Sequence, residues 1–378
     1  MTRFPSRLVS RRSALGLGGA SALVLAACGN DASTVSPPTR PALTPAPSLP
    51  AATATVPAVA TASAMEKELV IYSARKEALM APVVEAFEKS SGIKTLVKSG
   101  ATAELGLLIA QEGAATKADL FFTTDVIDAE VLRQRGLVAP HQSALTEAVP
   151  AEFKAPDGGW TGVIGRSRNL IVNTNLVKPA DYPTSVFDLT DAMWKGRVAG
   201  ASLREGGVRL WLASLLVLKG EEATTKYLEA LKANGLTVLS GHTEVTNAVA
   251  QGEFAIGMVN HYYFVPKRRE GAPVDLIYPD QGPDGIGTLV TPLAVAALKH
   301  APHPRAAKAF IDFVLSPEGS APMTTQEQEF PLRPGIGLGA AAVPGVRPID
   351  QIKRPSLDIV KLSESRNRAI ELYTPLFS

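Results

Sequence analysis

The sequence predicts an α/β fold in which two lobes, each a mixed sheet flanked by helices, enclose a ligand cleft between them. Strand-like and helix-like segments alternate along residues 68–136, and the alternation resumes more loosely in the second half of the chain. The folded body has roughly 310 residues, and the chain is 46% hydrophobic, which suffices for one large or two medium cores. In such folds, ligands bind beyond the carboxyl ends of the strands.

The first lobe begins with a strand at residues 68–74, where β-branched and aromatic residues cluster. A helix follows at 76–92, because apolar residues recur at helical spacing until Gly92 ends the run. Pro82 lies inside this run and predicts a kink or a later start of the regular helix. The next elements are a strand at 93–100, a helix at 102–113 with Thr102 as its N-cap, a strand at 118–125 and a helix at 126–136.

The second half continues with similar signals. Its predicted elements are helices at 208–220, 221–235 and 243–253, strands at 254–264 and 287–299, and an amphipathic helix at 303–319. We expect the chain to cross between the lobes near Gly165–Asn173 and near Gly287–Ala296. The domain prediction is therefore a first lobe of residues 67–165 plus 288–335, and a second lobe of residues 166–287 plus 336–378.

The N-terminus has the features of a bacterial export signal. Arg11 and Arg12 precede a short apolar run that ends at Cys28, and this run is too short to span a bilayer. "LAAC" at residues 25–28 resembles a lipobox, so we expect residues 1–27 to be removed and Cys28 to carry a lipid. The lipid would anchor the protein to the outer face of the cytoplasmic membrane. Residues 28–66 are rich in Pro, Ala and Thr, which predicts a disordered tether.

Composition argues against several classes of function. Cys28 is the only cysteine, so the folded body has no disulfide and no thiolate metal site. The signal holds four arginines and no acid, and its removal changes the formal charge from +2 to −2. The mature chain therefore lacks the excess of positive charge that is typical of nucleic-acid-binding proteins. No phosphate-binding glycine loop with a lysine, no HExxH and no G-x-S-x-G is present. We therefore expect a binding protein and not an enzyme.

Several stretches, in a fixed order, resemble the periplasmic iron(III)-binding proteins of ABC importers, also called ferric-ion-binding proteins. They extend from about Leu69 to Ile336 and include "VIYSARKEA", "KADLFFTTDVIDAEVLRQRGLVAP", "GRSRNLIVNTN" and "VAQGEFAIGMVNHYY". The resemblance implies a two-lobed periplasmic-binding-protein fold of type II, a monomer that binds Fe(III) in its cleft, and delivery to an ABC permease and its ATPase. It places the tyrosine pair of that family on Tyr262 and Tyr263.

Phenols suit this chemistry because Fe(III) prefers anionic oxygen ligands. The reference pKa of a phenol is near 10, and an adjacent trivalent cation favours the phenolate. Adjacent residues can share one ion only where the backbone leaves strand geometry, because neighbouring side chains of a strand point to opposite faces. The first-lobe histidine and glutamate of many family members are absent, and Arg75 and Thr124 stand near those positions. Three acids are candidates for additional metal ligands: Glu77, Asp125 and Glu205.

An anion is expected to complete the site, because two phenolates leave the ferric ion with one positive charge. Guanidinium groups bind carboxylate, carbonate or phosphate, and the segment "GASLREGG" before a helix offers backbone N–H groups. The anion-binding candidates are Arg75, Arg166, Arg168, Ser202 and Asn260, and the candidate synergistic anions are carbonate, phosphate and citrate. His261 is expected to point away from the tyrosines. The alternative function is binding of an anionic organic solute such as a phosphonate or sugar phosphate, since related families share the fold.

Overall fold

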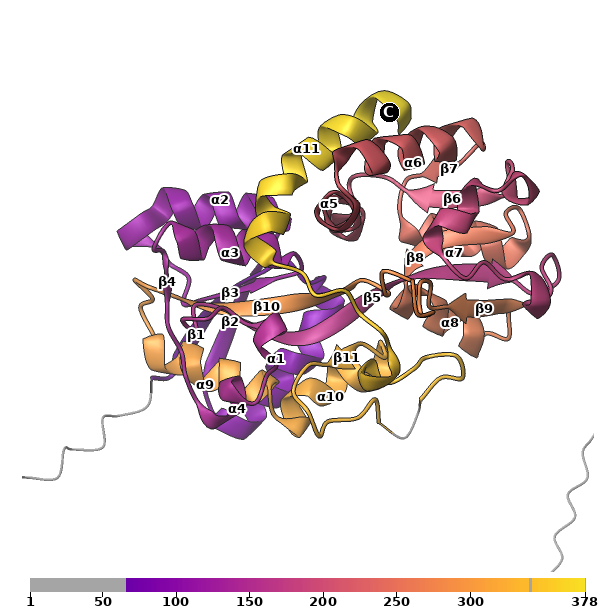
Figure 1. Ribbon diagram of the computed structural model, residues 1–378. Helices are drawn as coiled ribbons and strands as arrows, with labels where there is room; N and C mark the ends of the chain where they lie inside the picture. The colour runs from indigo at the N-terminus through magenta and orange to yellow at the C-terminus, as the bar shows by residue number, and fades with distance from the viewer. Residues whose placement is uncertain (1–65, 340–341, 378) are drawn as a thin grey trace, which may run out of the picture. The chain divides into compact units, whose positions relative to one another are not determined.

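One strand, β5 (Thr161–Asn173), connects the two sheets of the computed structural model, which describes residues 66–339 and 342–377. The first half of β5 pairs with β10 (Val290–Leu298), and its second half pairs with β8 (Ile256–Asn260). The strand order is β2-β1-β3-β10-β5-β8-β6-β7 (Figure 1). Outside this order, β4 pairs with β10, and β9 and β11 each pair with β5. The predicted signal, lipidated Cys28 and nearly all of the tether lie outside the described residues.

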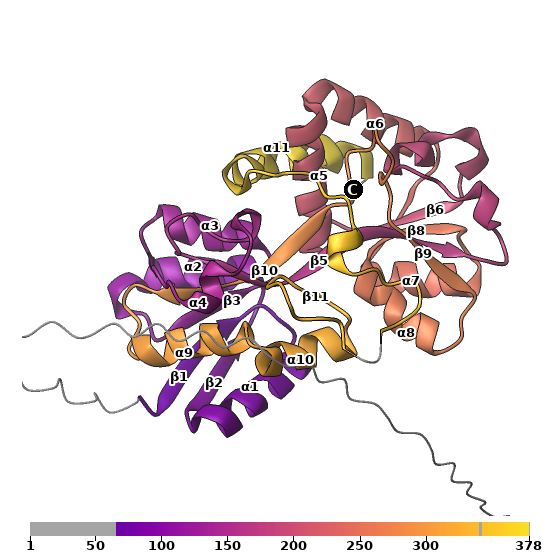
Figure 2. The ribbon, with the colours of Figure 1, turned by 60° about the horizontal axis from the view of Figure 1, so that its bottom comes forward.

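The first-lobe sheet is mixed, because three parallel strands meet the antiparallel β10. The parallel strands are β1 (Glu68–Ser73), β2 (Lys94–Ser99) and β3 (Leu120–Thr123). Helices cover both faces of this sheet, with one group on each face (Figures 1 and 2). The first group is α2 (Thr102–Glu112) and α3 (Val126–Gln134), and the second is α1 (Glu77–Ser91), α9 (Pro304–Val314) and α10 (Pro317–Gln326).

One local prediction for the first lobe needs correction, and one of the two alternatives for Pro82 is excluded. The cap of α2 is Ala101, which makes no side-chain cap bond, and Thr102 is already the first helical residue. The Thr102 hydroxyl instead forms a hydrogen bond of 2.9 Å with that of Thr124, so tertiary contact outweighs its capping preference. Pro82 lies within α1, so the regular helix begins before it, at Glu77, and not at Pro82. The helix is followed by Gly92, whose backbone is in the left-handed region.

The second lobe has parallel pairs among β6 (Val198–Ala201), β7 (Thr237–Leu239) and β8, whereas β5 is antiparallel to β8 and β9 (Val274–Ile277). Its helices are α5 (Gly206–Lys219), α6 (Glu221–Ala233), α7 (His242–Gln251) and α8 (Phe264–Arg269). Gly257 of β8 lets α7 approach closely, because a Cβ there would lie 2.6 Å from Val245 Cγ1. This contact holds the strand that leads into the tyrosine pair.

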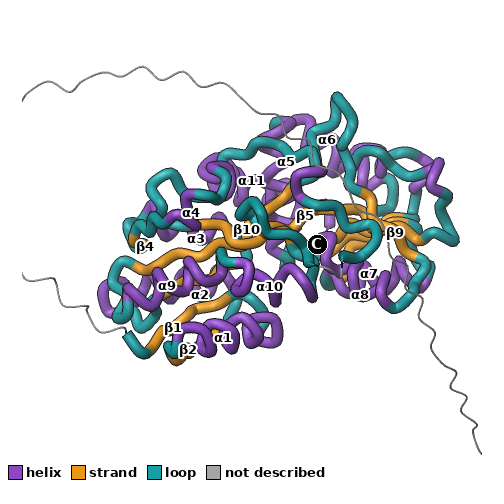
Figure 3. Tube along the Cα trace, turned by 90° about the horizontal axis from the view of Figure 1, so that it is seen from below, coloured by secondary structure: helices purple, strands orange, loops and turns teal. Residues whose placement is uncertain are grey.

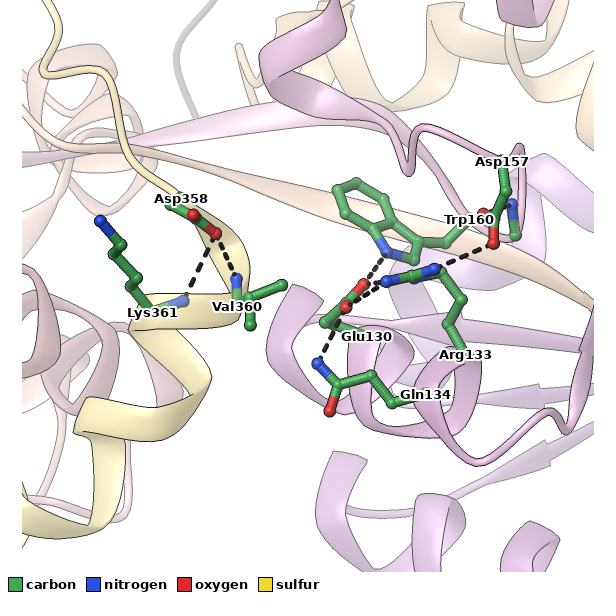
Figure 4. Close-up of polar contacts among 9 residues, drawn as sticks. Glu130, Arg133, Gln134, Asp157, Trp160, Asp358, Val360 and Lys361 are labelled. Atoms are coloured by element: carbon green, nitrogen blue, oxygen red, sulfur yellow. Dashed lines mark hydrogen bonds and ion pairs between the residues drawn. The ribbon is translucent and has the colours of Figure 1, made fainter.

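A hydrogen-bond network around Glu130 fixes the segment that enters β5 (Figure 4). The buried carboxylate of Glu130 accepts from Nε and Nη2 of Arg133, both at 2.8 Å, and from the indole N–H of Trp160 at 2.9 Å. Arg133 also donates to Asp157 at 2.9 Å. Burial opposes the charge of Glu130, but these donors and Gln134 lower its pKa. The bonds of Glu130 to Trp160 and of Arg133 to Asp157 therefore join α3 to the segment that precedes β5.

The C-terminal helix α11 (Ile359–Phe377) contacts α5 and α6 in the second lobe and α3 in the first (Figures 1 and 3). Asp358 caps its start by accepting from the backbone N–H of Val360 at 2.9 Å (Figure 4). Arg366 Nη1 lies 3.2 Å from Asp128 of α3, and Arg368 pairs with Glu221 of α6. Residues 336–378, predicted to belong to the second lobe, thus also contact the first. None of the described helices is long and apolar enough to cross a membrane.

Candidate functional site

The tyrosine pair lies on a single 3₁₀ turn, His261–Tyr263, between the end of β8 and the start of α8. The strand predicted through residue 264 therefore ends at Asn260. Because the turn abolishes the alternation of a strand, the rings of Tyr262 and Tyr263 lie side by side, with centroids 4.4 Å apart and planes inclined by 31°. Both side chains are partly exposed. The rings of these adjacent residues are therefore also neighbours in space.

His261 anchors this turn and does not contribute its ring to a ligand. It is fully buried, its Nδ1 accepts from the backbone N–H of Ser167 at 3.1 Å, and its Nε2 donates to the carbonyl of Gln328 at 2.9 Å. The ring also stacks on Phe330 at 4.1 Å. Burial lowers the pKa of His261 to about 4, so the imidazole is neutral at physiological pH. With both ring nitrogens engaged, His261 ties the turn to β5.

Arg166 of β5 links the tyrosine pair to the first lobe. Its guanidinium carbon lies 5.9 Å from the centre of the Tyr262 ring, and its Nη2 donates to the carbonyl of Thr124 at 2.5 Å. Thr124 follows β3, at the carboxyl end where ligands of such sheets bind. The Nε of Arg166 is buried and has no hydrogen-bond partner within the described chain. The Nε–H of Arg166 therefore lacks an acceptor among the described residues.

The first turn of α5 lies against Asn260, the last residue of β8. A Cβ on Gly207 would be 3.1 Å from Asn260 Nδ2, and Asn260 is 6% exposed. The partial positive charge of a helix N-terminus favours an anion at this position. Ser202, also predicted to bind the anion, lies before the helix, and its hydroxyl donates to the carbonyl of Ser240 at 2.7 Å. Its hydroxyl proton is therefore already engaged.

The surroundings of Tyr263 keep its phenol protonated. Burial raises the pKa of Tyr263, and the neighbouring Tyr262 and the carboxylate of Glu205 raise it further, whereas Arg166 lowers it. Glu205 occupies the N-cap position of α5 without a side-chain cap bond, and it is partly exposed. Of the three acids proposed as metal ligands, Glu205 is the one whose charge raises the pKa of Tyr263.

The first-lobe candidates have other positions and partners. Glu77 is exposed in the first turn of α1. Asp125 caps α3, where its Oδ1 accepts from the N–H of Ile127 at 3.0 Å. Arg75 is buried in an ion pair with Glu329, at 2.8 Å. In the described part of the chain, no cluster of three or more His, Cys, Asp or Glu side chains is suited to hold a metal ion.

Arg168, two residues after Arg166 on β5, is buried in the second lobe. Its Nη1 lies 3.2 Å from His242 Nε2, and its guanidinium carbon lies 5.9 Å from the centre of the Trp211 ring. Burial lowers the pKa of Arg168 to about 10, and Tyr373 of α11 is the first of several groups that favour its charge. The sequence pattern does not indicate this proximity of Tyr373, because the two residues are far apart in the chain.

The sequence matches a known family. A family profile described as bacterial extracellular solute-binding protein matches residues 115–361. The chain belongs to this family. Its members bind solutes outside the cytoplasm as part of transport, and they are not enzymes. The two-lobed α/β fold predicted from the sequence is confirmed, because solved structures of two-lobed members match this chain.

Several relatives of this solute-binding protein have names that refer to iron. The "Fe(3+)-binding periplasmic protein" of Serratia marcescens is 31% identical over 83% of this chain and 92% of its own length. The iron-bound HitA structure from Pseudomonas aeruginosa is 30% identical, with a TM-score of 0.73, over 82% of this chain and 99% of that one. A Trichodesmium structure in complex with iron and citrate is 25% identical, with a TM-score of 0.72 and coverage of 82% and 99%. A more distant relative, a putative 2-aminoethylphosphonate-binding periplasmic protein of Salmonella typhi, is 21% identical over 74% of this chain and 83% of its own length.

Proposed function

We propose that this solute-binding protein carries ferric iron, bound by the phenolates of Tyr262 and Tyr263 together with a small anion, and delivers it to the permease of an ABC importer. The observation that carries the proposal is the pair of adjacent phenols on one 3₁₀ turn, with ring centroids 4.4 Å apart. The names of the iron-binding relatives support iron as the cargo. We further propose that the mature protein is a monomer held at the outer face of the membrane by a lipid on Cys28.

The anion is expected beside Arg166, where the guanidinium and the first turn of α5 converge on the tyrosine turn. The unpartnered Nε of Arg166 and the amide of Asn260 supply donors. Carbonate, phosphate and citrate all present oxygen atoms that such donors bind. The iron and citrate in the Trichodesmium structure support this class of companion ligand. Glu205, partly exposed near Tyr263, is the proposed acidic ligand or charge partner on this side.

Loading is expected to release protons. Because burial raises the pKa of Tyr263, the phenol is protonated in the iron-free protein, and a ferric ion has to replace that proton. Each bound ion therefore releases about two protons from the two phenols. For the same reason, acid favours release of iron, since protons compete for the phenolate oxygens. Closure and opening of the lobes about β5 would accompany binding and transfer.

Absorption spectroscopy of the iron-loaded protein tests this assignment. Wild-type protein loaded with one equivalent of ferric citrate should show a visible tyrosinate-to-iron charge-transfer band. Tyr262→Phe and Tyr263→Phe should each lose most of its intensity and weaken iron retention against a chelator. Tyr182→Phe is the matched control, because Tyr182 is also a partly buried second-lobe tyrosine but bonds to Asp275 at 3.4 Å. It should keep the band.

Two results would contradict the ferric assignment. One is a wild-type protein without a visible band at stoichiometric iron, and the other is a double Tyr262→Phe, Tyr263→Phe variant that retains it. The alternative solute class is tested on the same samples by melting shifts with 2-aminoethylphosphonate and with a sugar phosphate. A shift with these ligands, combined with no response to iron, would favour the organic anion.

A further inference from the structure

Arg168 is a buried cation without an acidic partner. It is 5% exposed, it forms no ion pair with any described residue, and its Nε has no hydrogen-bond partner there. Its hydrogen-bond contacts in the described chain are to the two ring nitrogens of His242, at 3.2 and 3.4 Å. Burial and the charges of Arg168 and Arg166 lower the pKa of His242, so that ring is neutral. A buried charge without compensation is costly, which calls for a counter-charge.

The other buried arginine among the described residues has such compensation, and so has a partly buried one. Arg75, equally buried, lies 2.8 Å from the carboxylate of Glu329. Arg133 is bound by Glu130 and by Asp157. Arg168 instead faces aromatic groups, with the Trp211 ring at 5.9 Å. The carboxylate of Glu205 favours the charged form of Arg168, but the two groups do not form an ion pair.

A small pocket with a volume of about 20 Å³ has Arg168 in its wall. Apolar side chains from α5 and from the segment before β10 form most of the lining, including Trp211, Leu215, Ile286 and Leu289. The one acid in the lining, Asp280, already accepts from the hydroxyl of Ser185 at 2.6 Å and from the N–H of Val186 at 3.2 Å. Neither tyrosine of the pair is part of this lining.

We propose that this cavity is a second anion site, which takes a small monovalent planar oxyanion, such as nitrate or a short carboxylate, on the guanidinium of Arg168. The planar fork of a guanidinium matches the paired oxygens of such an anion. The apolar walls exclude large, strongly hydrated anions, and the limited space excludes bulky ones. This site is separate from the anion expected with iron, and it does not depend on the proposed iron function.

Thermal unfolding of the iron-free protein tests the proposal, with sodium nitrate compared against sodium gluconate at equal ionic strength. Gluconate is the control because its bulk prevents entry. Wild-type protein should show a rise in melting temperature with nitrate, on the order of 2 °C per tenfold increase in nitrate concentration above the Kd. Tyr262→Phe should retain this rise, which separates the cavity from the tyrosine site.

Two variants locate the response. Arg168→Gln should lose the nitrate effect and be at least as stable as wild type in gluconate, because it removes an uncompensated buried charge. Ile286→Phe keeps Arg168 and fills the cavity, so it should also lose the effect. Arg197→Gln is the matched control, since Arg197 also lies over a tryptophan, 5.5 Å from the ring centre of Trp194, but outside the cavity lining. It should respond like wild type.

A direct readout is the ¹⁵Nε–H NMR signal of Arg168, assigned by its loss in Arg168→Gln. It should shift with nitrate and stay constant with gluconate. The proposal is overturned if wild type does not respond to nitrate, which would leave only water in the cavity. It is equally overturned if Arg168→Gln responds like wild type.

Discussion

Asp125→Asn is predicted to stabilise the protein at neutral pH and to leave its stability unchanged in acid. Asp125 is 1% exposed at the N-cap of α3. Its Oδ1 accepts from Ile127, but its Oδ2 has no hydrogen-bond partner among the described residues and lies 3.8 Å from Arg366. Asparagine keeps the cap acceptor and removes the charge, so the substitution isolates the cost of burying that charge.

The expected magnitude follows from the pKa. Burial, and then the nearby Asp128, raise the pKa of Asp125 from 3.8 to about 6, although Arg366 and Arg209 act in the opposite direction. Between these two values the folded protein binds a proton that the unfolded chain does not. The free energy of unfolding therefore falls as pH rises from 4 to 6, by about 1.4 kcal/mol per pH unit and about 3 kcal/mol in total. Since the two arginines lose a partner in the variant, we expect a net gain of about 1–3 kcal/mol at pH 7.5.

Urea denaturation followed by tryptophan fluorescence measures this difference at pH 7.5 and at pH 4. Asp125→Ala is the companion variant, because it removes both the charge and the cap, and it should be about 1 kcal/mol less stable than Asp125→Asn at both pH values. A variant that is less stable than wild type at pH 7.5, or a difference that does not vary with pH, would refute the reasoning. Iron retention is a second readout: unchanged retention in Asp125→Asn would argue against Asp125 as a metal ligand.

Two further predictions concern the anchor of the tyrosine turn and the attachment of the protein. His261→Phe should lower the free energy of unfolding by about 2–4 kcal/mol, because it leaves the N–H of Ser167 and the carbonyl of Gln328 buried without partners. Urea denaturation checks this value, and unchanged stability would show that the ring packs but does not anchor. Cys28→Ala should move the protein from the membrane fraction to the soluble fraction of lysed cells, as followed by immunoblotting, and persistence in the membrane fraction would contradict the lipid anchor.

Local periodicity predicted much of the fold. The strand expected at 68–74 corresponds to β1 at Glu68–Ser73, and the helix expected at 126–136 corresponds to α3 at Val126–Gln134. The predictions failed where distant residues decide the outcome. Thr102 left its expected capping role for a hydrogen bond with Thr124, 22 residues away. The strand before the tyrosines ends at Asn260, and His261 is then held by Ser167 and Gln328.

The candidate site was likewise predicted where local motifs decide and missed where contacts between distant residues decide. The resemblance singled out Tyr262 and Tyr263, whose rings are neighbours in the structure, and Arg166, whose guanidinium lies over the ring of Tyr262. It could not separate Arg166 from Arg168, because both stand on the same strand with the same charge. It also could not show that Arg75 is committed to Glu329, which is 254 positions away in the chain. Partners of buried charges depend on tertiary contact, which periodicity does not describe.

The two arginines of β5 therefore have different relations to lobe movement. Arg166 donates to the carbonyl of Thr124 in the first lobe while it lies over Tyr262 of the second. Arg168 contacts His242 and Trp211, which both belong to the second lobe. Any hinge motion about β5 has to make or break the contact between Arg166 and Thr124, whereas these contacts of Arg168 move with its own lobe. One strand thus carries a cation that bridges the two lobes beside the tyrosines and, two residues later, a cation whose guanidinium contacts His242 and Trp211 within the second lobe.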